Sequence, residues 1–152
     1  MPINRRRFCS LLTVASMPPL LQQEAPLSQA AKPAPVLPSV ALPYEQMVMR
    51  TTQAGQSRAI MKGKLVSGEE LEMHHTTLNP GGSPHPAGHK HGYTEVWLIR
   101  EGTVEFTVNG KSTRLGPGAV AFASSDDFHS IRNVGDAPAN YFVVAVGPGA
   151  FR

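Results

Sequence analysis

Cysteine, aromatic residues and long apolar runs are all scarce in this chain of 152 residues. The only cysteine is Cys9, and aromatic residues make up 7% of the sequence. A single thiol excludes both an intrachain disulfide and a metal site built from several cysteines. The longest apolar stretch near the N-terminus is broken by Pro18 and Pro19. It is therefore shorter than the ~20 residues that a membrane-spanning helix needs.

Helical periodicity is also missing. No long segment repeats apolar residues at the i, i+3, i+4 and i+7 spacing of an amphipathic helix. Alternating apolar and polar residues are frequent instead, and 14 glycines and 14 prolines punctuate the chain. The length is enough for one domain and barely for two. These features predict a single all-β domain.

The N-terminus carries Arg5, Arg6 and Arg7 directly before an apolar stretch, in "NRRRFCSLLTVASM". This order resembles a twin-arginine export signal. Small residues at Ser28 and Ala30 would suit cleavage after residue 30. We therefore expect a signal peptide over 1–30 and a periplasmic or secreted protein without stable membrane insertion after cleavage. The alternative is a disordered basic tail on a cytoplasmic protein.

Most of the positive charge lies in the predicted signal. The whole chain has 14 basic and 11 acidic residues; without Arg5, Arg6, Arg7 and Glu24, 11 and 10 remain, a formal net charge of +1. No basic patch is left that would favour nucleic acid as a partner. Cys9 is removed with the signal as well, so the remaining chain has no cysteine nucleophile.

Residues 31–43 contain four prolines and few charges, which predicts an extended linker or arm. Short strands follow. Asn109-Gly110 favours a two-residue type I′ turn between two of them, because both residues tolerate positive φ. The regular spacing of strands and turns indicates a barrel or jelly roll. The expected strands are 58–65, 70–78, 94–99, 103–108, 111–115, 116–124, 128–133 and 140–146.

The stretch "HPAGHKHGYTEVWLIREG" holds the strongest candidate site. His89 and His91 would project to one face of an extended chain, and Glu95 would return to that face on the next strand. His129 is the only histidine further downstream and is the natural fourth ligand. Imidazole and carboxylate groups suit a divalent first-row metal and leave coordination positions open. The alternative is a set of ordinary polar residues on the solvated side of a sheet.

These residues resemble the two sequence motifs of the cupin superfamily. "HKHGYTEVWLIREG" is similar to the first motif, and "GAVAFASSDDFHSIRN" is similar to the second, although Ser124 and Asp126 stand where the family has proline and glycine. The resemblance implies a single cupin jelly-roll β-barrel over residues 44–152. It also implies that the barrel binds one metal ion through His89, His91, Glu95 and His129.

Several other residues are expected around the barrel interior. Trp97 and Ile99 share the parity of Glu95 and should form an apolar wall. One of His74 and His75 should face inward, either lining the pocket or hydrogen-bonded within the sheet. Asn133 should fix a strand end, and Asp126 and Asp127 should lie in an exposed turn. The predicted pocket-lining set is Trp97, Ile99, Phe106, Phe122, His85 and Tyr93, with His85 alternatively a solvated loop residue and Tyr93 alternatively a cover over the mouth.

The resemblance leaves the reaction open, because the fold hosts many functions. An oxidoreductase, in particular a dioxygenase, needs little beyond metal ligands and a dry pocket, so we favour it. A metal-dependent isomerase or lyase would need a proton shuttle, for which His85, an inward His74 or His75, and Tyr93 are candidates. A non-catalytic binding protein is the third alternative, so turnover itself is open.

The expected cofactor is one divalent transition metal ion. The expected partner of the protein is a small-molecule substrate or ligand. Folding before export would protect iron or manganese from competition by tighter-binding metals, so we favour these two over zinc or nickel. Small cupins resemble proteins that dimerise through sheet edges, so a homodimer to which residues 31–43 contribute a strand is a further expectation.

Overall fold

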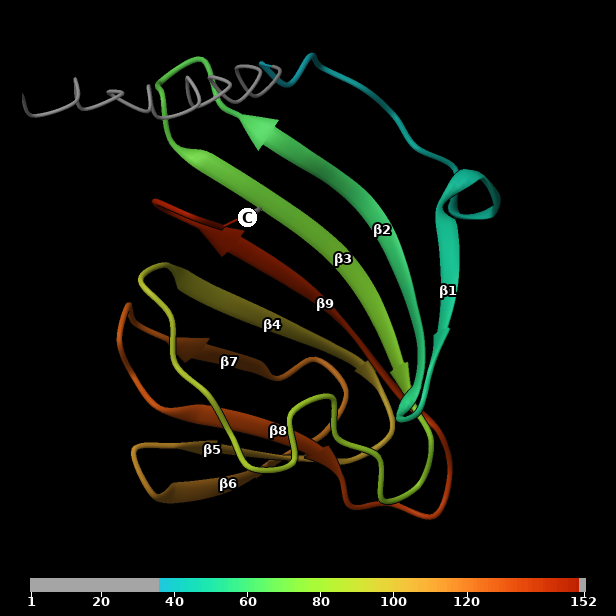
Figure 1. The fold of residues 1–152 in the computed structure, drawn as a ribbon. Coiled ribbons are helices and arrows are strands. Elements are labelled where there is room, and N and C mark those ends of the chain that lie inside the picture. Colours follow the sequence, from blue (N-terminus) through green and yellow to red (C-terminus); the bar gives the residue numbers. More distant parts are fainter. Residues whose placement is uncertain (1–35, 151–152) are drawn as a thin grey trace, which may run out of the picture. The chain divides into compact units, whose positions relative to one another are not determined.

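The computed structural model describes residues 36–150, and the predicted signal peptide lies outside them. The described part consists of strands, turns and one short 3₁₀ helix, so the all-β prediction is confirmed (Figure 1). Within these residues, no helix has the length and apolar character needed to cross a membrane. The elements are η1 (Tyr44–Gln46), β1 (Val48–Thr52), β2 (Gly55–Lys64), β3 (Glu70–Leu78), β4 (Thr94–Glu101), β5 (Val104–Val108), β6 (Lys111–Leu115), β7 (Val120–Ala123), β8 (His129–Asn133) and β9 (Ala139–Val146).

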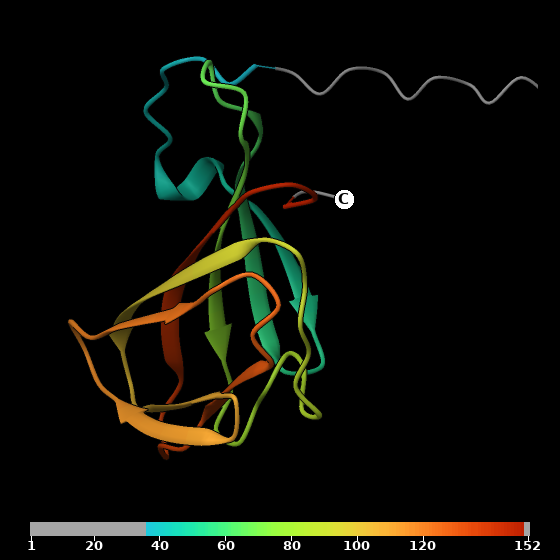
Figure 2. The ribbon, with the colours of Figure 1, turned by 90° about the vertical axis from the view of Figure 1, so that its left-hand side faces the viewer.

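The strands form two antiparallel sheets. The larger sheet has the order β1-β2-β3-β9-β4-β7, and the smaller has the order β6-β5-β8. Figures 1 and 2 show the larger sheet curving over the smaller one, so that the inner faces of the two sheets enclose the barrel interior. Strands β3, β9 and β4 lie side by side in the middle of the larger sheet, although β9 is the last strand of the chain.

Alternating side chains explain why the core lies between the sheets. On β9, Ala139, Tyr141, Val143 and Ala145 are buried, while the residues between them are only half-buried. On β4, the buried residues are Glu95, Trp97 and Ile99, and they alternate with residues that are more exposed. Residues at successive positions of a strand point to opposite faces, so this pattern places one face of each strand in the interior. The core includes Leu78, Trp97, Ile99, Val104, Phe106, Ile131, Tyr141 and Val143.

The predicted hairpin at Asn109-Gly110 is present between β5 and β6. Asn109 has φ of 47° and Gly110 has φ of 80°, the positive values that a type I′ turn requires. The Asn109 side chain also contacts the segment before β8. Its Nδ2 donates to Asp127 Oδ1 at 2.7 Å, and its Oδ1 accepts the N–H of Phe128 at 3.1 Å. The turn is therefore tied to the segment that leads into His129.

Strand β1 is absent from the sequence-based expectation. All five of its residues are exposed, so it has no alternation of buried and exposed positions that a sequence pattern could reveal. Its pairing with β2 forms the edge of the larger sheet, and β2 begins at Gly55, three residues before the expected start. The described part of the predicted arm contacts the far end of β2. There, Leu37 N–H donates to the Lys64 carbonyl at 2.8 Å.

Candidate metal centre

A short loop carries the two histidines that precede β4. His89 forms an antiparallel bridge with His129, with backbone N–H···O distances of 2.9 and 2.8 Å in the two directions. Gly88 allows this close approach, because its φ is 73° and an added Cβ would lie 2.5 Å from the Phe128 ring. The bridge therefore fixes His89 beside the first residue of β8.

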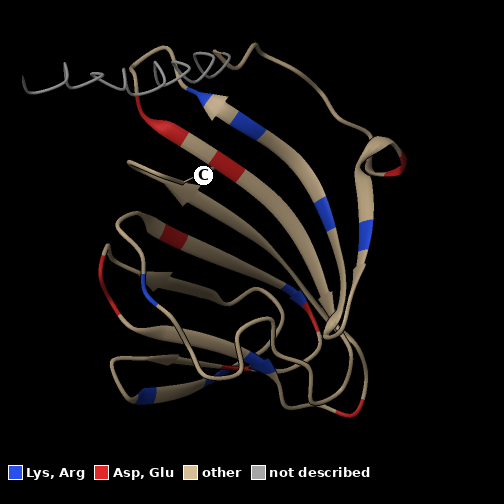
Figure 3. Cartoon of the chain, in the orientation of Figure 1, with Lys and Arg blue, Asp and Glu red and all other residues tan. Residues whose placement is uncertain are grey.

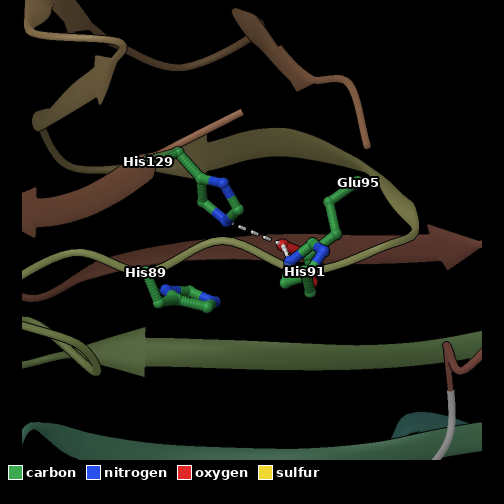
Figure 4. A group of neighbouring side chains, drawn as sticks. All are labelled: His89, His91, Glu95 and His129. Atoms are coloured by element: carbon green, nitrogen blue, oxygen red, sulfur yellow. Dashed lines mark hydrogen bonds and ion pairs between the residues drawn. The ribbon is translucent and has the colours of Figure 1, made fainter. Parts of the chain in front are cut away.

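Four side chains converge at this bridge (Figure 4). His89 and His91 come from the loop, Glu95 from β4 and His129 from β8. One potential ligand atom from each residue lies within 4.8 Å of all the others. Glu95 Oε2 is 3.0 Å from His91 Nε2 and 3.2 Å from His129 Nε2. The structure therefore brings together all four residues that the sequence predicts as metal ligands.

Backbone carbonyl groups orient two of the imidazole rings. His91 Nδ1 donates to the carbonyl of Tyr93, and His129 Nδ1 donates to the carbonyl of Asp127, both at 2.9 Å. In a neutral imidazole, a proton on Nδ1 leaves a lone pair on Nε2. Both Nε2 atoms then face the carboxylate of Glu95, which is also an acceptor. Three acceptors that point at one another require a cation between them, either protons or a metal ion.

His89 supplies a separate test of whether these residues fit a metal. Its Nδ1 is buried and has no hydrogen-bond partner within residues 36–150. Burying an unpaired polar atom is costly, and one ring nitrogen of His89 belongs to the set of possible ligand atoms that lie within 4.8 Å of one another. Three imidazoles and one carboxylate are also a donor set that divalent first-row metals accept in proteins. The residues therefore fit such an ion, and the cluster could hold one.

Burial and mutual contacts shift the protonation equilibria of the cluster. Burial, with smaller contributions from His85 and His129, lowers the pKa of His89 to about 4. Burial alone would raise the pKa of Glu95, but the hydrogen bond from His129 and the charge of His91 outweigh it and lower the pKa. Burial would likewise lower the pKa of His129, whereas its contact with Glu95 raises it. The carboxylate is thus held in the ionised form that metal binding requires.

A cavity of about 600 Å³ opens beside the cluster. His89, Glu95 and His129 line one part of it, and side chains of the larger sheet line much of the rest. The volume suits a small organic molecule. Within the described residues 36–150, no Lys or Arg lines this cavity, whereas several hydroxyl groups do. Its polar lining outside the cluster comprises Thr52, Gln53, Ser57, His74, Thr76, Ser83, His85, Ser130 and Tyr141.

The residues predicted to line this cavity have different outcomes. Trp97 and His85 do line it, and the His85 ring lies 4.1 Å from that of His89. Ile99 and Phe106 are buried in the core and are not among the lining residues. Tyr93 is not a lining residue either; its ring stacks on His91 at a centroid distance of 3.6 Å, so it supports a ligand from behind.

Phe122 is a clear correction, because it is 56% exposed and faces away from the barrel interior. On β7, Ala121 and Ala123 are the buried residues, so the strand turns Phe122 and Val120 outward. The strand sequence "VAFA" contains no polar residue that would show which face is inside. The prediction therefore placed Phe122 inside on hydrophobicity alone. In the structure, Ala121 and Ala123 occupy the inner face of the strand instead.

Sequence reasoning missed Tyr141 and left His74 undecided. Tyr141 is 1% exposed and lines the cavity, and burial raises the pKa of its hydroxyl group, so the phenol stays neutral. His74 is the inward-facing member of the two adjacent histidines and also lines the cavity. His75 instead packs on the outer face against Tyr44 and Phe142, at centroid distances of 5.6 and 5.0 Å. Alternation along β3 is the sequence signal that could have identified His74 as the inward residue, because it shares a face of the strand with Thr76 and Leu78.

Two aspartates stabilise the turn before His129, where the sequence departs from the cupin motif at two positions. Asp126 stands where the motif has glycine, and its φ is 66°, a conformation that aspartate tolerates better than most residues. Asp127 Oδ2 accepts the N–H of Ser124 at 3.2 Å, and Asp126 N–H donates to the His91 carbonyl at 2.8 Å. Both aspartates thus have backbone roles in a turn, and the His91 loop is anchored to it.

Comparison with known proteins agrees with this geometry. Residues 74–145 match the family model described as "Cupin domain". The segment includes all four residues of the cluster. The chain is also 34% identical over 79 residues to L-ectoine synthase of Bordetella petrii. That match covers 51% of this chain and 57% of the relative, so the chain spans less than two thirds of the relative's length.

Solved structures show the same fold. KdgF from Halomonas sp. is similar with a TM-score of 0.63 and 13% identity, covering 73% of this chain and 96% of that protein. A predicted oxalate decarboxylase from Thermotoga maritima is similar with a TM-score of 0.58 and 22% identity, covering 72% of this chain and all of that protein. Together with the family match, these likenesses support the cupin superfamily and identify the barrel as a cupin jelly roll.

Proposed function

From a cupin barrel whose His/Glu cluster could bind a metal, we propose a mononuclear metalloenzyme that acts on a small, oxygen-bearing organic molecule. The observation that carries this proposal is the convergence of His89, His91, Glu95 and His129 beside the cavity, which three of the four residues line. The likeness to L-ectoine synthase supports an enzyme rather than a non-catalytic binding protein. A bound divalent metal would supply Lewis-acid polarisation of a carbonyl or hydroxyl oxygen, or a redox centre.

The chain's own residues provide orientation and exclusion of water. Trp97 and Val143 form apolar parts of the wall, which favours a desolvated reacting group. The carbonyl groups of Tyr93 and Asp127 hold His91 and His129 with Nε2 toward the centre. Tyr141 contributes a neutral hydroxyl group that can donate a hydrogen bond to a substrate oxygen.

Two reaction classes are compatible with this arrangement. An oxidoreductase, including a dioxygenase, would use the metal and a dry pocket and would need few other groups. A metal-dependent isomerase or lyase requires a group that moves a proton. The inward position of His74 is the observation that favours this second class, because His74 lines the cavity but does not belong to the metal cluster.

The test is turnover with and without dioxygen. The full chain would be loaded with iron, manganese, zinc or nickel and incubated with small hydroxy-ketones, diketones, keto acids and phenols. We expect metal-dependent turnover that His91→Ala abolishes and that Lys90→Ala, an exposed neighbour in the same loop, retains. Turnover that requires dioxygen would assign an oxidoreductase, and turnover that persists anaerobically would assign an isomerase or lyase. Equal activity in His91→Ala would refute the metalloenzyme.

We further propose that residues 1–30 direct export of the folded protein, so that iron or manganese is inserted before export. The support is the arginine triplet before an apolar stretch. A version routed unfolded through the general secretory path should then acquire a different metal, such as zinc or copper. Acquisition of the same metal by both routes would refute the proposal.

A further inference from the structure

A second pair of ionisable side chains faces the barrel interior outside the metal cluster. Glu72 and His74 lie two residues apart on β3 and share a face of the strand. His74 Nδ1 is 2.9 Å from Glu72 Oε2 and 3.1 Å from Oε1. Both side chains are partly accessible, 28% for His74 and 23% for Glu72. A short contact therefore orders the pair, and His74 is the member that lines the cavity.

The strand register places this pair across from the metal cluster. Glu72 is opposite Ala145 on β9, which is opposite Glu95 on β4. His74 is opposite Val143, which is opposite Trp97. Since neighbouring strands are ~4.8 Å apart, the Cα atoms of Glu72 and Glu95 are roughly 10 Å apart on the same face of the sheet. Figure 3 shows the acidic segment near the start of β4 at the same end of this sheet as the acidic segments of β3.

Small side chains separate the two sites. Ala145 and Val143 are the residues between them on the inner face of β9. His74, Val143, Trp97 and Glu95 all line the same cavity. A small molecule held at the cluster would therefore extend across Ala145 and Val143 toward His74. In this arrangement, the His74 side chain on β3 can contact a substrate that is bound on the β4 side of the cavity.

The hydrogen bond to Glu72 determines what His74 can do. Because the carboxylate accepts the Nδ1 proton, the lone pair of the neutral ring lies on Nε2. Within residues 36–150, Nε2 of His74 has no hydrogen-bond partner. The contact with the Glu72 carboxylate also fixes the orientation of the His74 ring. His91 and His129 differ from His74 in the partners of both ring nitrogens. Their Nδ1 atoms donate to carbonyl groups, and their Nε2 atoms face Glu95.

The surroundings support an acid–base role over a simple ion pair. Lys62 on β2 is the cross-strand neighbour of Glu72 but makes no ion pair with it. The other ionisable groups around the cavity are Tyr141 from β9, Glu95 from β4, His129 from β8, and His85 and His89 from the loop. Among these histidines, His74 is the only one whose ring is held by a carboxylate outside the cluster.

We propose that Glu72 and His74 form the proton-transfer pair of this enzyme, acting on a small hydroxy- or keto-compound bound at the cluster. This inference rests on the proposed function. His74 Nε2 takes a proton from a carbon next to the carbonyl group, so the C–H bond breaks, an N–H bond forms, and the electron pair stays on the substrate as an enolate. The proton then returns to the neighbouring carbon in an isomerisation, or to a hydroxyl group that leaves as water. No oxidant or reductant is consumed.

The absence of Lys and Arg from the cavity lining narrows the substrate further. A dicarboxylate would have at most one acid group at the metal and would leave the other without a cationic partner in a half-buried site. Hydroxyl-rich lining instead suits neutral hydroxyl and carbonyl groups. The substrate class is therefore a neutral hydroxy-ketone or a compound with a single acid group.

The test measures hydrogen–deuterium exchange at carbon, which needs no knowledge of the natural substrate. The zinc-loaded full chain is incubated in D₂O with hydroxyacetone, dihydroxyacetone or pyruvate, and loss of the C–H signal is followed by proton NMR. We expect the wild type to accelerate exchange, and His74→Gln to slow it by about 100-fold or more, the usual contribution of a general base. Glu72→Gln should slow exchange less, because the amide oxygen can still accept the Nδ1 proton without the charge.

Two controls and a second readout separate this pair from the metal site. His74→Gln must keep the zinc content of the wild type, whereas His91→Ala must lose it. His75→Gln, on the outer face of the same strand, should exchange like the wild type. In ¹⁵N NMR spectra of the zinc-loaded protein, His74 should show the Nδ1–H tautomer, and its Nε2 resonance should shift when hydroxyacetone is added.

The possible results distinguish the proton-transfer pair from the proposed metalloenzyme function. Exchange at the wild-type rate in His74→Gln, or no exchange by the zinc-loaded wild type with any of the three probes, would overturn the proton-transfer pair and leave the metalloenzyme standing. Failure of the wild type to bind metal would overturn the proposed function itself. Loss of exchange in His74→Gln with zinc retained would support both.

Discussion

At the scale of single residues, Asn133 shows how one buried polar side chain connects separate segments of the barrel. It is fully buried; its Nδ2 donates to the carbonyl groups of Leu78 and Ala137, and its Oδ1 accepts the N–H of Gly135. The side chain thus joins the end of β3 to the turn after β8. The sequence predicts this role in outline, since asparagine commonly satisfies backbone groups at strand ends.

Asn133→Ala should therefore be strongly destabilising. It leaves the buried carbonyl group of Leu78, and the partly buried carbonyl group of Ala137 and N–H of Gly135, without this partner; a buried group left unpaired costs ~1–3 kcal/mol. We expect the free energy of unfolding to fall by about 3 kcal/mol in urea titrations. The matched control is Asn79→Ala, because Asn79 directly follows Leu78 and its side chain is exposed. A difference below about 0.5 kcal/mol between the two variants would contradict the assigned role.

His75 connects a single residue to the pH dependence of stability. Burial lowers its pKa below the ordinary value of 6.5. The folded state then binds this proton less readily than the unfolded state, so stability rises with pH across the interval between the two pKa values. His75 thus contributes full stability above pH ~6.5 and loses it as the pH falls below that value.

His75→Phe should flatten this part of the pH profile. Phenylalanine retains an aromatic ring between Tyr44 and Phe142 but has no proton to bind. Unfolding free energies measured between pH 7.5 and 5 should fall less steeply in the variant than in the wild type, because other histidines still titrate in both. Parallel profiles in the two proteins would show that His75 is not the group responsible.

At the scale of elements, strands were easier to predict from the sequence than the faces they present. All eight expected strands correspond to β2 to β9 within a few residues, because turn residues such as Asn109-Gly110 mark their ends. β1 had no pattern to reveal it, and β7 had no polar residue to orient Phe122. The ligand set was predictable because its members lie in two short motifs, whereas the Glu72–His74 pair depends on pairing between strands distant in the sequence.

The loop that carries His89 and His91 offers a prediction about how the fold sets metal affinity. In Gly88→Ala, the new Cβ would collide with the Phe128 ring at a position with φ of 73°. We expect the loop to shift and the zinc affinity to fall about tenfold or more, since a left-handed conformation costs non-glycine residues ~1–2 kcal/mol. Competition titrations with a chromogenic chelator would measure this change.

Gly92→Ala is the matched control for the loop. Gly92 lies beside His91, and an added Cβ would have no atom within 4 Å. Its zinc affinity should stay within about twofold of the wild type. Equal affinities in Gly88→Ala and Gly92→Ala would mean that the backbone at residue 88 does not position the ligands.

At the scale of the whole molecule, the metal should stabilise the fold it completes. Its four ligands come from the loop and from strands of both sheets, so binding would link the two layers of the barrel. A ligand that binds only the folded state stabilises it by about 2.7 kcal/mol at a free concentration 100 times its dissociation constant. Zinc should therefore raise the unfolding temperature of the wild type measured by calorimetry.

This stabilisation should depend on pH with a definite sign. The imidazoles bind metal only when deprotonated, so the rise in unfolding temperature should shrink as the pH falls through and below ~6.5. His129→Ala should show no rise at any pH. A zinc-induced rise that is the same at pH 5 and pH 7.5 would indicate binding at carboxylates alone, elsewhere on the protein.

The most direct test of the central claim is the metal content of the full chain purified without chelator, measured by inductively coupled plasma mass spectrometry beside His91→Ala and Lys90→Ala. The four-residue cluster predicts near one transition-metal ion per chain in the wild type and in Lys90→Ala, and almost none in His91→Ala. Equal metal content in all three proteins, or no metal in any of them even after incubation with iron, manganese, zinc or nickel, would contradict it.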